Sequence, residues 1–383
     1  MISQGHRLKL GQILMKSLYV HFPFCEAKCH YCDFYSLGKN RTRDGDADKF
    51  ESALTREASQ QAHRLDPNLD TLFFGGGTPS MTPAKAMSAA LKPLRLENRI
   101  TPNTEWTMEA NPSSIHKISF QEYRALGVNR ISMGVQAFRD DHLQMLGRVH
   151  TGQHALKSLE TVFESGFTNV SVDLLCGIPD QTEDDLEKAL STFIQFPITH
   201  LSCYLLTLPP HHKMYPLLPH EDTQLKHLLF IDEWMKSQGF EHYEISNFAR
   251  PGKRARHNLN YWQGKSYLGL GPSAHSFDAE KSLRWKNVSS LHKYASLLED
   301  QSSVIEWEEH LTSEQIHLEH WMLALRLDEG FPQSWISSEL QKNRLKTFES
   351  QGLIEDHPLR EDHKRLTAKG FALSDMIISS LAS

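Results

Sequence analysis

The chain has 383 residues, of which 39% are hydrophobic and 23% charged, and its formal net charge is −6. This balance is ordinary for a globular protein and excludes a disordered chain. The 41 basic residues against 47 acidic ones argue against a dedicated nucleic-acid-binding protein, so no nucleic-acid partner is expected. No stretch approaches the roughly 20 apolar residues that a membrane-spanning helix needs.

The N-terminal segment 1–16 lacks the continuous apolar core of a signal peptide. We interpret it as an extension before the first domain, with Met15 as an alternative start to Met1. The chain has five cysteines, an odd number, and no such signal. This combination predicts a cytoplasmic protein whose thiols are free or bound to metal.

Residues 17–240 alternate short apolar runs with longer helical patterns. The predicted strands are Ser17–Phe24, Thr71–Phe74, Glu105–Asn111, Arg130–Gln136, Asn169–Leu175 and His200–Leu206. The predicted helices between them lie near 46–64, 83–96, 116–126, 152–165 and 182–195. Strands separated by helices predict right-handed βαβ units and a parallel sheet. The predicted fold class is therefore α/β, with a partial (β/α)6 barrel.

Three of these strands carry polar residues at alternate positions. In Glu105–Asn111, for example, Trp106 and Met108 alternate with Thr107 and Glu109. A parallel strand that is buried on both faces is expected to be almost continuously apolar. We therefore predict a lumen that holds a polar ligand at the carboxyl-terminal mouth of the barrel, with contact to ordinary water as the alternative.

The remaining chain divides into an α+β connecting region at 241–310 and a helical region at 311–383. In the second, Leu353–Glu355 and Lys364–Thr367 are typical of a small hairpin between helices, as in a winged helix. Residues 331–383 hold seven basic and seven acidic residues, which gives no electrostatic footprint for DNA. We interpret this winged-helix-like domain as a structural or partner-docking cap.

Three cysteines form a CxxxCxxC motif directly after the first predicted strand: Cys25, Cys29 and Cys32. Three thiolates satisfy three irons of a 4Fe-4S cluster and leave the fourth iron open to an outside ligand. A zinc site completed by His21 or His30 is the alternative. The other two cysteines, Cys176 and Cys203, lie in apolar runs and are predicted to be inert core residues.

The cysteine motif resembles that of the radical S-adenosylmethionine (SAM) superfamily, and further elements recur in order. The strand Thr71–Phe74 runs into Gly75-Gly76-Gly77-Thr78-Pro79. Glycines let a ligand approach the backbone without interference from a Cβ atom. By itself this loop could be a tight turn or a phosphate loop without its lysine. After the cysteine motif it is similar to the family loop that holds the amino group of SAM.

The third strand ends in Glu109-Ala110-Asn111-Pro112, which resembles the coproporphyrinogen III oxidase (HemN-like) family within this superfamily. The resemblance implies a SAM site in which two tyrosines flank the cofactor, the glycine loop lines it, a glutamate binds its ribose and three polar residues complete the lumen. In that order these are Tyr19, Tyr31, Gly76, Gly77, Thr78, Glu109, Gln136, Arg148 and Asp173.

Two departures separate the chain from the dehydrogenase branch of that family. Phe34 stands where that branch carries a further cysteine, and only 24 residues precede Cys25, whereas the branch has a longer arm. Both features match the heme chaperones of HemW type. A third feature of that type is the HNxxYW motif at 257–262.

The motif predicts a heme site. A neutral imidazole is the usual proximal ligand of heme iron, so His257 is the predicted axial ligand, and Tyr261 or Trp262 is predicted to pack on the porphyrin. Arginine recognises carboxylates in a bidentate manner, so Arg254 or Arg256 is predicted to bind a heme propionate. A structural histidine and a solvated basic turn are the alternatives.

These observations predict a heme chaperone that binds heme, a 4Fe-4S cluster and SAM and passes heme to an acceptor protein. A respiratory membrane protein is the candidate acceptor and a homodimer the candidate assembly. No catalytic residue is predicted. The alternatives are an oxygen-independent coproporphyrinogen III oxidase and, third, a zinc-stabilised interaction protein.

Overall fold

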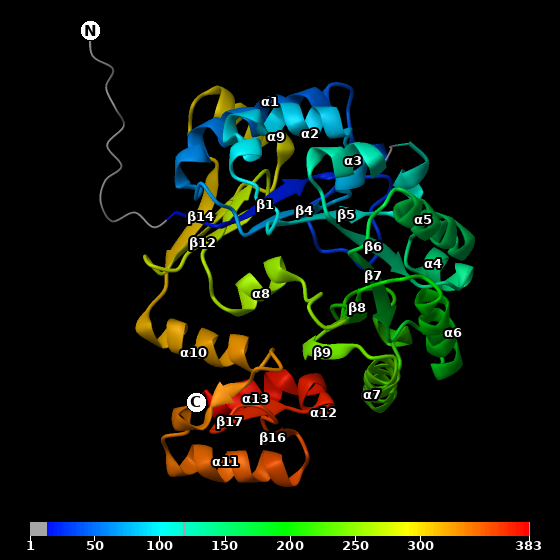
Figure 1. Cartoon of the computed structure of the whole chain (residues 1–383), viewed down its shortest axis with the longest axis vertical. Coiled ribbons are helices and arrows are strands. Elements are labelled where there is room, and N and C mark those ends of the chain that lie inside the picture. Colours follow the sequence, from blue (N-terminus) through cyan, green and yellow to red (C-terminus); the bar gives the residue numbers. More distant parts are fainter. Residues whose placement is uncertain (1–13, 118–119, 383) are drawn as a thin grey trace.

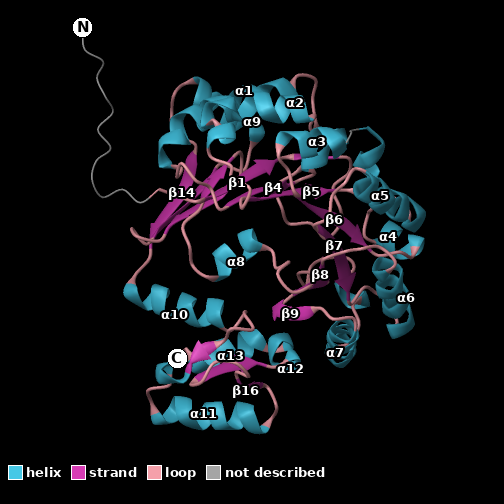
Figure 2. Ribbon diagram, in the orientation of Figure 1, coloured by secondary structure: helices cyan, strands magenta, loops and turns pink. Residues whose placement is uncertain are grey.

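The computed structural model describes residues 14–117 and 120–382. Most of the predicted extension 1–16, including Met1, lies outside the described residues, so the choice between Met1 and Met15 as the start stays a prediction. The centre of the fold is a curved nine-stranded sheet with helices on its outer side (Figures 1 and 2). Its strands, in spatial order, are β11 (Leu268–Leu270), β1 (Ser17–Phe22), β4 (Thr71–Gly76), β5 (Glu105–Ala110), β6 (Arg130–Gln136), β7 (Val170–Cys176), β8 (His200–Leu205), β10 (Asn247–Ala249) and β9 (Glu241–Glu244).

All six predicted strands are confirmed and lie side by side in parallel, from β1 to β8. The predicted helices are confirmed as well: α1 (Asp46–Gln61), α2 (Ala84–Leu91), α3 (Phe120–Leu126), α5 (Gly152–Glu164) and α6 (Glu183–Ile194). Among the described residues, the outer strands β11 and β9 do not pair with each other, so the barrel is partial, as predicted.

The sheet extends beyond residue 240, which the sequence did not predict. Strands β10 and β9 add an antiparallel edge, and β11 pairs in parallel with β1 on the other side. The unpredicted helices α4 (Asp140–Met145) and α7 (Glu221–Ser237) complete the outer layer. The connecting region predicted at 241–310 thus contributes strands to the sheet; the predicted domain boundaries themselves stay predictions.

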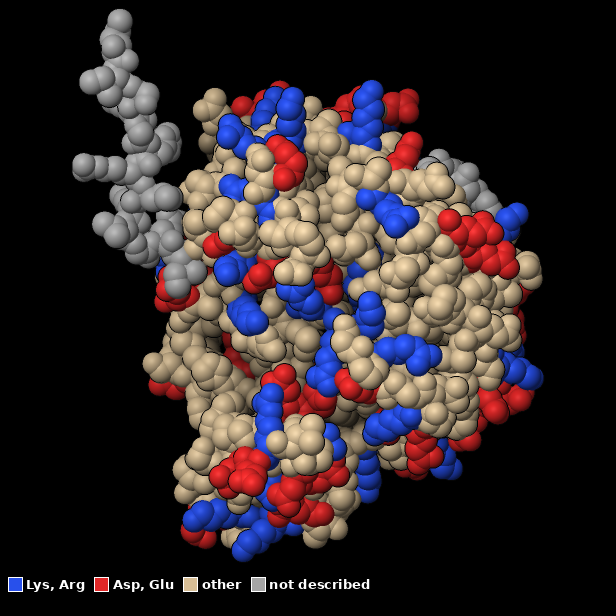
Figure 3. Space-filling view, viewed as in Figure 1, with Lys and Arg blue, Asp and Glu red and all other residues tan. Residues whose placement is uncertain are grey.

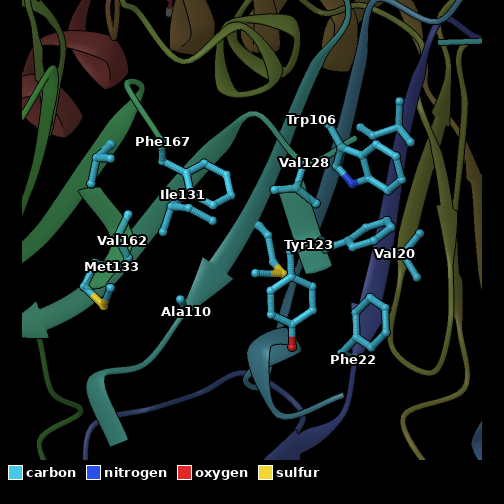
Figure 4. Close-up of a cluster of buried hydrophobic side chains, with 14 of the residues drawn as sticks. Val20, Phe22, Trp106, Ala110, Tyr123, Val128, Ile131, Met133, Val162 and Phe167 are labelled. Carbon is cyan, nitrogen blue, oxygen red and sulfur yellow. The ribbon is translucent and has the colours of Figure 1, made fainter. Parts of the chain in front are cut away.

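The apolar residues of the parallel strands point outward and pack under the helices. Figure 4 shows Trp106, Ile131 and Met133 of β5 and β6 among Tyr123 of α3 and Phe167, and all five are at most 3% exposed. Both remaining cysteines, Cys176 and Cys203, are buried in this core, as predicted. The polar residues of the same strands therefore face the opposite side, which is the lumen.

A second, antiparallel sheet follows the barrel: β12 (His275–Asp278), β13 (Leu283–Asn287) and β14 (Ile305–His310). Between its last two strands runs α9 (Leu291–Glu299), which packs against α1. This small sheet lies at one end of the barrel (Figure 2). It provides a wall next to the lumen.

The C-terminal unit comprises α10 (Ser313–Ala324), α11 (Glu339–Ser350), α12 (Ala368–Ala372), α13 (Ser374–Leu381) and a three-stranded sheet. The sheet consists of β15 (Phe331–Pro332), β17 (His363–Leu366) and β16 (Ile354–Asp356), and so the predicted hairpin is confirmed. In Figure 3, basic and acidic residues are mixed on the visible face of this unit. None of the helices in the described part of the chain is both long and apolar enough to cross a membrane.

Candidate functional site

The cysteine loop is held between the sheet and neighbouring segments. It is closed by the short parallel pair β2 (Phe24–Cys25) and β3 (Leu37–Gly38). The His30 backbone N–H donates to the Leu146 carbonyl (3.1 Å), and its ring Nδ1 donates to the Met145 carbonyl (3.0 Å). These bonds fix the loop at the carboxyl-terminal mouth of the barrel.

Two of the three thiols accept hydrogen bonds from residues predicted to bind SAM. The Thr78 hydroxyl donates to Cys25 Sγ (3.5 Å), and Arg148 Nη1 donates to Cys29 Sγ (3.4 Å). Burial raises the pKa of the Cys25 thiol and of the Cys32 thiol. A metal that binds these sulfurs displaces their protons, so three thiolate charges develop in the loop and leave a net negative charge on a cluster of core charge +2.

A buried cation balances that charge. The Arg148 guanidinium donates to the Gly134 carbonyl and to Cys29, but its Nε has no hydrogen-bond partner, and no carboxylate pairs with it in the described structure. An unpaired buried charge is costly, so Arg148 is suited to an anionic group bound beside it. The three thiols and this arginine fit a 4Fe-4S cluster, which supplies electron transfer and an open iron when bound.

The zinc alternative finds no support. In the described ranges, no three Cys, His, Asp or Glu side chains converge on a single ion. His21 uses Nδ1 with the Tyr19 hydroxyl (3.0 Å) and Nε2 with the Tyr35 carbonyl (2.8 Å). Since each thiolate of a cluster binds a different iron, a cluster does not need the close convergence that one zinc ion needs.

The glycine loop lies directly beside the cysteine loop. The Gly77 N–H donates to the Phe22 carbonyl, and the Thr78 N–H donates to the Phe24 carbonyl, both at 2.7 Å. A Cβ atom on Gly77 would lie 2.7 Å from the Phe24 oxygen and 2.8 Å from the Phe22 oxygen. Gly76 has φ +104°, which favours glycine. The loop therefore requires its glycines for close backbone approach.

Two carboxyl groups face the lumen next to this loop. Glu109 accepts the Gly76 N–H (3.2 Å), and burial together with the negative charge of Asp173 raises the pKa of Glu109 to about 8. Asp173 accepts the Ser132 hydroxyl (3.1 Å). Burial raises the pKa of Asp173 as well. Buried carboxyls with few partners are suited to bind the hydroxyl and ammonium groups of a polar ligand.

The structure brings the nine predicted SAM-site residues to one mouth of the barrel. Tyr19, Gly76 and Glu109 line the same cavity, Gln136 lies beside Gly134, and Tyr31 lies near Arg148. Gln136 has φ +73°, a conformation rare outside glycine and often found at functional sites. That these residues hold SAM stays a prediction.

The HNxxYW motif forms α8 (Arg256–Trp262), a short helix on the inner side of the curved sheet (Figure 1). The Glu105 carboxylate accepts the backbone N–H groups of Arg256 (3.1 Å) and His257 (3.0 Å), which caps the helix. Asn260 donates to the Ser17 hydroxyl (2.8 Å). These bonds hold α8 inside the lumen, where it fills part of the space, and we call this helix the plug.

His257, the predicted axial ligand of heme iron, lies inside the protein with hydrogen-bond partners on both sides of its ring. The side chain is 1% exposed, Nδ1 is 2.7 Å from the Thr71 hydroxyl, and Nε2 is 2.8 Å from the Tyr261 hydroxyl. Burial and the positive charge of Arg130 lower the pKa of His257 to about 3. Both ring nitrogens are engaged inside the protein, so axial ligation of heme iron by His257 would require breaking one of these hydrogen bonds. The heme role of His257 stays a prediction, and the contacts favour the structural alternative.

The predicted propionate partners are also engaged elsewhere. Arg254 pairs with Asp328 (2.7 Å) and Glu241 (3.0 Å), so its charge is already balanced. Arg256 donates through Nη1 to the Asn103 carbonyl. The predictions for these two arginines are therefore not supported, because a propionate would have to displace existing acceptors.

The two aromatic residues of the motif, Tyr261 and Trp262, have different surroundings. The Trp262 ring lies under Arg326, with 5.4 Å between the guanidinium carbon and the ring centroid, and Trp262 is not among the residues that line the cavity. Tyr261 does line it. Of the five residues predicted to bind heme, Tyr261 is the one that lines this cavity, and the heme roles of all five stay predictions.

The cavity has a volume of about 780 Å³, within the range of small-molecule sites. Its inner end is formed by Tyr19, Gly76 and Glu109, and its outer end by residues of β12, β13 and α10. Figure 3 shows this face hollowed between the barrel and the C-terminal helices. The sequence missed Tyr204, which alternation along β8 could have revealed, and His275, which lies in a strand too short to carry a pattern.

Comparison with known proteins identifies the family of this chain. Residues 19–193 match the Radical SAM superfamily. Heme chaperone HemW of Mycobacterium tuberculosis is 32% identical over 95% of this chain and 94% of its own length. HemW of Bacillus subtilis is 31% identical over 96% and 99%. The chain belongs to the HemW family within the radical SAM superfamily, which confirms the predicted resemblance.

A solved structure supports the fold. Coproporphyrinogen III oxidase HemN of Escherichia coli, a radical SAM enzyme, matches with a TM-score of 0.80 at 24% identity, covering 97% of this chain and 91% of that chain. The match confirms the predicted α/β architecture, including the helical C-terminal region. At this identity it shows the fold alone.

Proposed function

We propose that this protein is a heme chaperone that binds heme, a 4Fe-4S cluster and SAM and delivers heme to an acceptor protein. Membership of the HemW family over nearly the full chain is the observation that carries the proposal. The cavity, which extends from the carboxyl groups at the barrel mouth to an open outer end, has room for a small-molecule cargo.

The cluster is assigned to Cys25, Cys29 and Cys32, with Arg148 as the balancing charge. SAM is assigned to the inner end of the cavity, next to the glycine loop and Glu109. There Tyr19 closes the site from β1, and the buried Asp173 and Gln136 complete its polar wall. These residues bind and orient the cofactor and keep water out.

The cluster assignment is tested by anaerobic reconstitution with iron and sulfide. We expect Cys29→Ser to lose most of the bound iron and the brown colour. Cys176→Ala is the matched control, because this thiol lies in the core away from the loop, and it should keep both. Equal iron content in the two variants would contradict the assignment.

The choice between chaperone and oxidase is tested on one reconstituted sample. We expect hemin to bind with a defined absorption spectrum, and anaerobic incubation with SAM, a reductant and coproporphyrinogen III to yield no protoporphyrinogen. Phe34 is 69% exposed at the cavity, where the dehydrogenase branch carries a cysteine. Product formation would refute the chaperone-only proposal.

The acceptor and the assembly belong to the same proposal. The family resemblance supports a respiratory membrane protein as the heme acceptor and a homodimer as the carrier. Heme-loaded protein mixed with a heme-free respiratory cytochrome should lose its heme spectrum as the cytochrome gains one. Light scattering of the reconstituted protein should give twice the chain mass. Retention of the heme by this protein would contradict transfer to the cytochrome, and a mass of one chain would contradict the homodimer.

A further inference from the structure

We propose that heme occupies the outer end of the cavity, with His275 as the axial ligand of its iron and Lys286 as the partner of a propionate. This inference rests on the proposed function and replaces the heme site predicted at α8. It assigns the cargo to one face of the small sheet β12–β13–β14, which no sequence motif indicated.

The register of that sheet places the required groups together. In the antiparallel pair β12–β13, His275 lies opposite Lys286, and Phe277 lies opposite Arg284. Side chains of directly opposed residues, and of residues two positions along a strand, share one face of a sheet. All four line the cavity, whereas Trp285, on the other face, is buried in the core.

Three histidines line the cavity, and only His275 lies on the same sheet face as Lys286. Both nitrogens of His21 are engaged, and the ring of His320 stacks on Trp335 with centroids 6.4 Å apart. His275 is exposed, and within the described residues its ring has no hydrogen-bond partner. Burial and the charges of Lys286 and Arg284 lower the pKa of His275, which favours the neutral imidazole that ligates iron.

The two cations on the same face differ in their existing partners. Arg284 is held by Glu309 (2.7 Å) and by Glu319 (2.6 Å), so its charge is balanced. Among the described residues, Lys286 pairs with Glu306 alone, at 3.7 Å, and both side chains of that pair are partly exposed. A weak, solvated ion pair is readily exchanged for a propionate. Of these two cations, Lys286 is therefore the one that is available to bind a propionate.

The walls suit a flat apolar ring. Tyr261 and Tyr267 meet edge to face with centroids 4.6 Å apart, and Phe277 extends this aromatic surface. From α10, Ile316 and Leu323 line the cavity as well. A porphyrin with aromatic residues on one side and aliphatic residues on the other buries both of its faces.

The experiment titrates hemin into the reconstituted full-length protein and compares four variants by absorption spectroscopy. We expect His275→Ala to shift the Soret band and to weaken hemin binding at least tenfold, and added imidazole to restore the wild-type spectrum. Lys286→Glu should weaken binding several-fold and leave the spectrum unchanged. His320→Ala tests the other exposed histidine of the cavity and His257→Phe is the control; both should keep the spectrum and the affinity.

The outcomes separate this inference from the proposed function. If wild-type protein binds no hemin, the proposed function fails. If wild-type protein binds hemin and His275→Ala has the same spectrum and affinity, this site is wrong. Imidazole rescue distinguishes loss of the ligand from misfolding, because a misfolded cavity would not regain the spectrum. Loss of the spectrum in a folded His257→Phe would equally overturn the assignment and restore α8 as the site.

Discussion

His257 and His275 have the same side chain, but burial gives their ring nitrogens different hydrogen-bond partners. The first lies in a motif and has both nitrogens engaged at 1% exposure, whereas the second lies in no motif and has an unpartnered ring on the cavity wall. The sequence shows residue type and spacing, but not which hydrogen bonds a ring makes across the barrel. For that reason the sequence could predict that the three cysteines and the residues assigned to SAM lie together, but it could not predict the hydrogen bonds of the residues assigned to heme.

Replacing His257 should destabilise the protein. His257→Phe keeps the ring contacts with Phe73 and Tyr261 but leaves the buried Tyr261 hydroxyl unpartnered and removes a hydrogen bond from Thr71. We expect a loss of about 2 kcal/mol in the free energy of unfolding, measured by urea denaturation. His320→Phe, at an exposed position, should change it by less than about 0.5 kcal/mol. Equal stability of the two variants would contradict the structural role.

A single methyl group at the glycine loop should abolish SAM binding without unfolding the protein. In Gly77→Ala, the new Cβ meets two carbonyl oxygens at under 3 Å, so the loop must move away from the cysteine loop. We expect at least a tenfold loss of SAM affinity in equilibrium dialysis. Gly252→Ala is the control: its φ of +74° strains an alanine, but the new Cβ would meet nothing within 4 Å and the residue lies in an exposed turn, so the SAM affinity should not change. Unchanged SAM affinity in Gly77→Ala would refute the placement of SAM.

At the scale of elements, the length of each strand determined whether the sequence could predict it. Strands of six or seven residues with an apolar outer face were found within one or two residues of their ends, because alternation over that length is visible. The strands β9 to β11 have only three or four residues and no repeating pattern. They join the sheet because their backbone pairs with β8 and β1, a tertiary effect that short segments do not encode locally.

One buried carboxyl ties several elements together and gives a pH dependence. Glu57 of α1 accepts hydrogen bonds from Gly271 after β11, Asn287 of β13 and Tyr294 of α9. Burial outweighs these bonds and raises the pKa of Glu57 from 4.5 to about 7. Since the folded protein holds this proton more tightly than the unfolded chain, the carboxyl reduces stability as pH rises from 4.5 to about 7, by roughly 3 kcal/mol in total.

Glu57→Gln tests this dependence because the amide does not titrate. The difference in the free energy of unfolding between variant and wild type should therefore change in favour of the variant between pH 4.5 and 7 and stay constant above that. Other titrating groups are common to both proteins and cancel. A difference that does not vary with pH would show that the pKa of Glu57 is not raised.

At the scale of the molecule, the C-terminal unit is joined to the barrel by polar contacts and by packing of Phe371 against His242, whose ring centroids are 4.9 Å apart. The backbone N–H of Ile245 donates to the Arg326 carbonyl, and that of Asp328 donates to the Tyr243 carbonyl, both at 3.0 Å. The Asp328 carboxylate also holds Arg254 through two hydrogen bonds. Because α10 of this unit forms one wall of the cavity, these contacts also position that wall.

Removing the carboxylate should loosen that wall. We expect Asp328→Ala to cost about 1 kcal/mol and to speed cleavage near residues 325–332 in limited proteolysis, because half-buried Arg254 keeps only Glu241. Glu355→Ala is the control; its pair with Arg365 lies within the C-terminal sheet and should leave proteolysis unchanged. The same cleavage rate in both variants would contradict a role for Asp328 in closing the cavity.

The pairing of β1 with β11 has a consequence for synthesis. The strand that precedes the cysteine loop is made first, but its second neighbour is made only after the rest of the parallel sheet. Until then, an apolar strand edge is open to pairing with other chains, and such edges promote aggregation. The plug α8 is made shortly before β11. A ribosome-bound chain therefore has its cluster loop while the barrel is still open, so the metal centre is accessible for assembly before the last strand joins the sheet.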